Sequence, residues 1–92
     1  MKAVVSYLPL ADEDLLVKIE RQGGHHAVCV EHRPTGCYAA ASDLPYGWSI
    51  EECVRQAKKI VEAQVRLGEQ YPDGPPKVRI LASQYTMADL KQ

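Results

Sequence analysis

The sequence predicts an α+β fold of two layers, in which one long amphipathic helix packs on one face of an antiparallel β-sheet. Three observations predict this class. Short β-branched and aromatic runs, several of them alternating with polar residues, are separated by turn residues. One long segment with helical periodicity follows most of them. The 92 residues suffice for a single domain with one core, so we expect one domain over 1–92 with the order β-β-β-β-α-β.

Five segments have the composition of strands. They are residues 3–8, 15–21, 25–32, 37–42 and 77–83. Gly23-Gly24 predicts a two-residue hairpin turn, because a type I′ turn needs positive φ at both central positions. Residues 33–36, with Pro followed by Gly, predict a second turn.

The two turns predict the strand register. A two-residue loop pairs Gln22 with His25, and the remaining pairs follow from it. The expected pairs are Ile19–Val28, Val17–Val30, Leu15–His32, His32–Cys37, Val30–Ala39 and Val28–Ala41. One face of the sheet then collects an apolar set: Val17, Ile19, Val28, Val30, Ala39 and Ala41. A slip by one residue would mix this set with polar positions.

The helix is predicted to begin after Ser49, an N-cap residue that forms a capping box with Glu52. Trp48 before the cap and Cys53 could form a hydrophobic staple. Apolar residues recur on one helical face from Ile50 to Leu67, and Gly68 is the expected C-cap. Residues 84–92 are predicted either as one helical turn, capped by Thr86, or as a frayed tail.

Composition excludes several classes of protein. Eleven Lys and Arg against twelve Asp and Glu give a net charge of −1, without the basic excess of a dedicated nucleic-acid-binding domain. The first residues are too few and too quickly acidic for a signal peptide or a membrane span. Three cysteines, an odd number, indicate reduced thiols. We therefore expect a cytoplasmic protein with no membrane association.

The stretch GGHHAVCVEHRPTGC at 23–37 contains all three histidines and two of the three cysteines. Strand alternation puts His26 and His32 on one face, roughly 20 Å apart, and His25 and Cys29 on the other. A zinc site needs three or four converging ligands, so we predict no metal and no cofactor here. His32 and Cys37 are cross-strand neighbours and could form a base and nucleophile, which leaves a thiol or metal enzyme as an alternative.

Two features indicate contact with a protein partner instead of catalysis. The outer face of the sheet is expected to carry small residues at its centre, namely Ala27, Cys29, Ala40 and Ser42. The loop before the helix carries two aromatic residues, which are favoured anchors at interfaces. The predicted partner-binding residues are Tyr46, Trp48, Tyr38, Lys18 and Glu31.

A second class of function is nucleic-acid binding through the basic side of the helix. The residues that would contact phosphates are Arg55, Lys58, Lys59 and Arg66. Interleaved acids, such as Glu62, weaken the positive field of this surface.

Residues 15–63 resemble the N-terminal domain of HicB-type antitoxins. The matching pieces lie in AAASDLPYGWSIEEC, as Asp43-Leu44-Pro45 and the helix start Ser49-Ile50-Glu51-Glu52. The resemblance implies a sheet-and-helix domain that blocks a toxic ribonuclease by protein contact. The chain departs from the family pattern in having Tyr46-Gly47 where Gly-Cys usually follows the DLP residues.

The sequence as a whole favours a small non-enzymatic binding or inhibitor protein that occupies the surface of a protein partner, of antitoxin or phage-inhibitor type. A phage-encoded inhibitor of a CRISPR effector, or of another host nucleoprotein, is the alternative within the same class. If the outer sheet face is open, a homodimer is a further alternative; the terminal residues TMADLKQ, or water, could cover that face instead.

Overall fold

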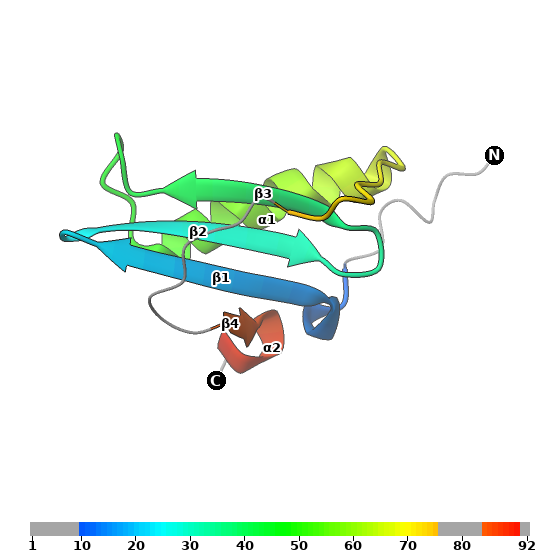
Figure 1. Cartoon of the computed structure of the whole chain (residues 1–92), viewed down its shortest axis with the longest axis horizontal. Coiled ribbons are helices and arrows are strands. Elements are labelled where there is room, and N and C mark those ends of the chain that lie inside the picture. The colour runs from blue at the N-terminus through cyan, green and yellow to red at the C-terminus, as the bar shows by residue number, and fades with distance from the viewer. Residues whose placement is uncertain (1–9, 76–83, 91–92) are drawn as a thin grey trace.

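The computed structural model describes residues 10–75 and 84–90. A 3-10 turn at Asp12–Asp14 leads into the first strand. The other elements are β1 (Leu15–Gln22), β2 (His25–His32), β3 (Cys37–Ser42), α1 (Ile50–Arg66), β4 (Gln84–Thr86) and α2 (Met87–Leu90). Strands β1, β2 and β3 form an antiparallel meander, and α1 lies across one face of it, against β2 and β3 (Figure 1).

The predicted class, a small α+β domain with an antiparallel sheet and one long helix, is confirmed. The order of strands in the sheet is β3-β2-β1-β4. Strand β4 has only three residues and was not predicted as a strand; it pairs with Leu16–Lys18 in the first half of β1 and leads directly into α2. The strands predicted at 3–8 and 77–83 lie outside the described residues, so the order β-β-β-β-α-β stays a prediction.

The strand register is the predicted one at every pair, from Gln22 opposite His25 to His32 opposite Cys37. The apolar face of this sheet meets α1 and forms the core. The buried residues of that core are Leu15, Val17, Ile19, Val28, Val30, Cys37, Ala39, Cys53, Val54, Ala57, Val61 and Met87. Because the side-chain period of a strand is two, this one register buries the whole apolar set together.

The ends of α1 are set by local hydrogen bonds. Ser49 Oγ accepts a hydrogen bond from the Glu52 N–H at 3.1 Å, as predicted. The Glu52 carboxylate does not complete the capping box; it turns along the helix to Gln56 Nε2 at 2.6 Å and Arg55 Nη2 at 2.7 Å. At the other end Gly68, with φ +77°, donates to Val65 O at 2.9 Å, and the helix closes in a Schellman motif.

The outer face of the sheet, which the sequence left either open or covered, is covered around Cys29. Cys29 lies on that face but is fully buried, and the burial raises the pKa of its thiol. Lys18, directly across from Cys29, forms an ion pair with Glu31 at 3.6 Å. The side chains of Lys18 and Glu31 are themselves mostly buried. They lie beside the Cys29 thiol and help to cover it.

The loop after α1 also reaches the outer face. It passes around the start of β3, where the Tyr71 N–H donates to Thr35 O at 3.2 Å. The Tyr71 ring then packs edge-on against Tyr38, with centroids 5.3 Å apart. None of the helices in the described part of the chain has the length and apolar character needed to cross a bilayer.

Candidate binding loop

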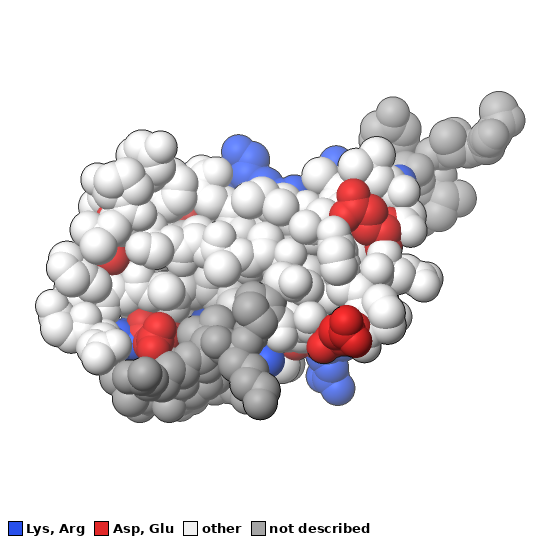
Figure 2. Space-filling model, turned by 45° about the horizontal axis from the view of Figure 1, so that its top comes forward, with Lys and Arg blue, Asp and Glu red and all other residues white. Residues whose placement is uncertain are grey.

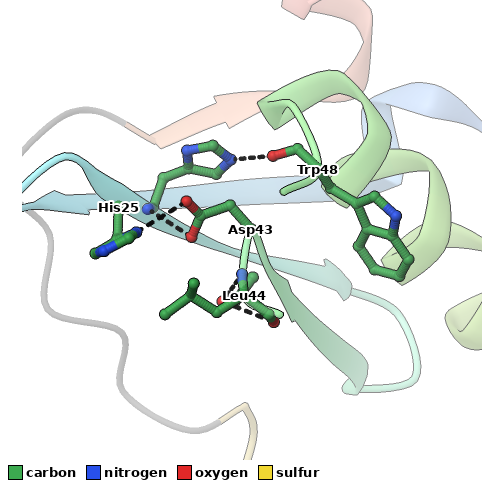
Figure 3. Close-up of polar contacts among 6 residues, drawn as sticks. His25, Asp43, Leu44 and Trp48 are labelled. Carbon is green, nitrogen blue, oxygen red and sulfur yellow. Dashed lines mark hydrogen bonds and ion pairs between the residues drawn. The ribbon is translucent and has the colours of Figure 1, made fainter. Parts of the chain in front are cut away.

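The segment that joins β3 to α1, residues 43–48, forms the candidate site, here called the binding loop. It is anchored through Asp43. The carboxylate of Asp43 accepts from His25 Nδ1 at 3.1 Å and from the His26 N–H at 3.2 Å, and its own N–H donates to His26 O at 3.1 Å (Figure 3). The hydrogen bond from His25 is the main reason why the pKa of the Asp43 carboxyl lies below its ordinary value.

The far end of the binding loop is held by the same strand. His26 Nε2 donates to Trp48 O at 2.8 Å, because a carbonyl oxygen can only accept (Figure 3). Within the loop the Gly47 N–H donates to Asp43 O, and the Leu44 N–H donates to Ser42 Oγ at 3.0 Å. The Leu44–Pro45 peptide bond is cis. The backbone of the loop is thus closed on itself and fastened to β2 at both ends.

Two apolar side chains of the binding loop face water. Leu44 is 58% exposed and Tyr46 is 70% exposed. Tyr46 stacks on Trp48 with ring centroids 4.9 Å apart, while Trp48 packs against the core. The Trp48 ring, packed on the core, therefore supports the exposed Tyr46 ring. Leu44 is exposed beside it, and the backbone of the loop is already ordered. Such an arrangement suits binding because little conformational freedom is left to lose.

Sequence reasoning treated His25 and His26 as ordinary hairpin side chains and missed their role in holding the binding loop. The signal that could have revealed it was the register. Continued by one residue beyond Ala27–Ser42, the predicted pairing places Asp43 opposite His26. A carboxylate at the end of one strand, opposite two histidines of the next, is an obvious candidate for a hydrogen-bonded anchor.

His32 and Cys37 are cross-strand neighbours, as predicted, but their polar atoms have other partners. His32 Nδ1 bonds Thr35 Oγ1 at 2.8 Å, and Cys37 Sγ donates to Glu69 O at 3.1 Å. The thiol proton is thus directed to a backbone carbonyl, so this geometry does not present a base to a nucleophile. Over residues 10–75 and 84–90, no three His, Cys, Asp or Glu side chains converge as metal ligands would.

The buried imidazole of His32 is expected to make stability depend on pH. Burial lowers its pKa below the ordinary value, and the nearby Asp14 carboxylate offsets this only in part. The unfolded chain, with a His pKa of about 6.5, then binds more protons than the native state, so stability falls as the pH drops below about 6.5. Urea unfolding of wild type and His32→Gln between neutral and mildly acidic pH measures this contribution. The variant should show the shallower fall; parallel curves for the two proteins would contradict the assignment.

The five predicted partner-binding residues form two separate groups. Tyr46 and Trp48 lie in the binding loop, whereas Lys18, Glu31 and Tyr38 lie on the outer face of the sheet. Tyr38 is four residues before the end of β3, so the two groups are separated by roughly 13 Å along the strand. Only the first group is presented on an exposed, preordered segment.

The basic side of α1 is partly neutralised. Arg55 pairs with Glu52, and Lys58 Nζ lies 3.9 Å from carboxylate oxygens of both Asp12 and Glu62. Lys59 and Arg66 are exposed. On the face that Figure 2 draws, charged side chains lie in scattered groups on a largely uncharged surface. The ion pairs of Arg55 and Lys58 favour a solvated helix face over a phosphate-binding surface.

The chain matches no protein-family model, and neither a curated protein nor a solved structure is significantly similar to it.

Proposed function

We propose that this protein is a non-enzymatic binding domain that inhibits a protein partner by occupying its surface with the binding loop. The observation that carries the proposal is the exposure of Leu44 and Tyr46 on a loop whose backbone is held at both ends. Exposed aromatic anchors on preordered segments are typical of interface hot spots.

The resemblance to HicB-type antitoxins rests on the same segment, because Asp43-Leu44-Pro45 and the Ser49 helix start are its matching residues. A toxic ribonuclease is therefore the first class of partner to test. A phage-type inhibitor of a CRISPR effector would use a surface of the same kind, and the identity of the partner separates the two.

We also propose a cytoplasmic location. Cys29, Cys37 and Cys53 are all free and buried, and burial raises the pKa of the Cys29 and Cys53 thiols. Free thiols are usual in a reducing compartment.

Affinity capture from native lysate with the tagged chain, with and without nuclease treatment, tests the proposed function. The expected result is one stoichiometric protein that survives the nuclease, and whose purified form binds the wild-type chain directly. A partner that is lost on nuclease treatment, together with a low-salt gel shift abolished by Lys58→Glu/Lys59→Glu, would instead support the basic side of α1. In that case the proposed role of the binding loop would be wrong.

A further inference from the structure

Among the described residues, nothing pairs with the outer edge of β3, so this edge offers unpaired backbone groups. The Asp43 N–H donates to His26 O, directly across the β2–β3 pairing, so by alternation the odd-numbered residues of β3 bond to β2. The N–H and C=O groups of the even-numbered residues, Tyr38, Ala40 and Ser42, therefore point away from the sheet. Among the described strands β3 is at the end of the sheet, and Ala40, at its middle, is exposed.

This edge lacks the features that normally prevent strands from pairing between molecules. Edge strands are usually protected by charged side chains, proline or a bulge. The sequence of β3, CYAAAS, has no charge and no proline, and its register with β2 is uninterrupted. The described part of the loop after α1, up to residue 75, reaches the beginning of β3 through the bond from Tyr71 to Thr35.

The flank of α1 on the same side of the molecule is apolar. Lys58 reaches Asp12, which precedes β1, so that flank of the helix faces the β1 side. Ile60 follows two residues later, about 200° around the helix, and therefore lies on the opposite flank, toward the β3 edge. Its side chain is 48% exposed, so apolar surface is available beside this strand edge.

We infer that a second copy of this chain occupies this edge, with the two β3 strands antiparallel across a twofold axis near Ala40. Each copy then supplies the unpaired groups that the other needs, as an isologous interface requires. Because α1 lies over β2 and β3, the two helices would be roughly 10 Å apart, which is the distance at which helices pack, with Ile60 between them.

The dipoles of the two helices favour the same arrangement, because antiparallel helices place the N-terminus of one beside the C-terminus of the other. The paired sheet would be continuous across the two molecules, and both binding loops would remain outside the paired strands.

Mass measurement by sedimentation velocity from about 1 µM to about 500 µM tests the dimer, because self-association depends on concentration. We expect a species of twice the chain mass of 10.2 kDa. Ala40→Pro removes an N–H that points away from β2, and Ile60→Glu puts a charge at the axis; each should raise the dimer dissociation constant at least about tenfold. Ala88→Glu is the control, since it adds the same charge to an exposed position of α2, at the opposite end of the sheet from β3, and should leave the dimer intact.

Cross-linking keeps the inference testable if either variant fails to fold. Directly opposed residues of this kind have Cα atoms about 5.5 Å apart, within the range of a disulfide, so Ala40→Cys should form a disulfide-linked dimer on mild oxidation. Ala11→Cys, which is also exposed, should remain unlinked. A mass of one chain at all concentrations, or a dimer that neither variant weakens and Ala40→Cys does not link, would overturn the inference. Tyr46 is not one of the paired β3 residues. Binding of the protein partner through the binding loop is therefore measured in a separate experiment, and either proposal can fail without the other.

Discussion

Tyr46→Ala is expected to weaken binding to the protein partner by about 30-fold or more, because truncation of an aromatic hot spot typically costs at least about 2 kcal/mol. The phenol is 70% exposed in the free protein, so it contributes its area to the complex and little to the core. Loss of the stack on Trp48 should lower the stability of the free domain by no more than about 1 kcal/mol. Calorimetric titration of the purified partner gives the affinity, and thermal unfolding gives the stability.

Arg33→Ala provides the control for this comparison. Arg33 is also exposed, but it lies in the turn at the opposite end of β2 and β3 from the binding loop. Its removal should leave the affinity unchanged. If Tyr46→Ala binds the partner with unchanged affinity, Tyr46 and the binding loop are not part of the interface. A large loss of stability would instead show that Tyr46 serves the core.

Gly36→Ala is expected to destabilise the domain by more than about 2 kcal/mol, through two costs that add. Gly36 has φ +76°, in the left-handed region that disfavours a side chain. A Cβ at this position would also lie 2.5 Å from the carbonyl oxygen of Tyr71, which is backbone and cannot rotate away. The loop after α1 would have to move, and with it the bond from Tyr71 to Thr35 and the bond from the Cys37 thiol to Glu69.

Gly68→Ala separates the two costs. Gly68 has φ +77°, almost the value at Gly36, but a Cβ there would meet nothing within 4 Å. Its replacement should therefore cost only the backbone part, about 1 kcal/mol. Chemical denaturation of both variants measures the difference. If both variants lose the same free energy of unfolding, the loop over Gly36 moves aside at no energetic cost and does not stabilise the domain.

Local chemistry accounts for the parts that sequence analysis predicted correctly. The positive φ needed at Gly23-Gly24 sets the first turn, and the turn sets the pairing of Ile19 with Val28. Ser49 caps α1 because its hydroxyl reaches an N–H three residues along the chain. Each of these features depends on neighbours in sequence or on the period of a strand, so it can be read without knowing the rest of the fold.

The features that sequence analysis missed or left open have different causes. Whether the outer face around Cys29 is covered depends on segments distant in sequence, and in the structure Cys29 is fully buried. Glu52 was expected to close the capping box and instead pairs along the helix with Arg55 and Gln56, because a carboxylate with several donors in reach takes the best placed. The strand β4 has three residues, too few to show a periodic pattern in the sequence.

The sequence by itself determined the meander register, the apolar face and the limits of α1, because turn geometry, strand alternation and capping act over a few residues. Only the tertiary structure decided which groups the His26 imidazole and the Cys37 thiol bond. His26 Nε2 donates to Trp48 O, 22 residues away, and the Cys37 thiol donates to a carbonyl 32 residues away. Such partners are chosen by proximity in the folded chain, where a buried donor must find an acceptor, and proximity of that kind has no period in the sequence.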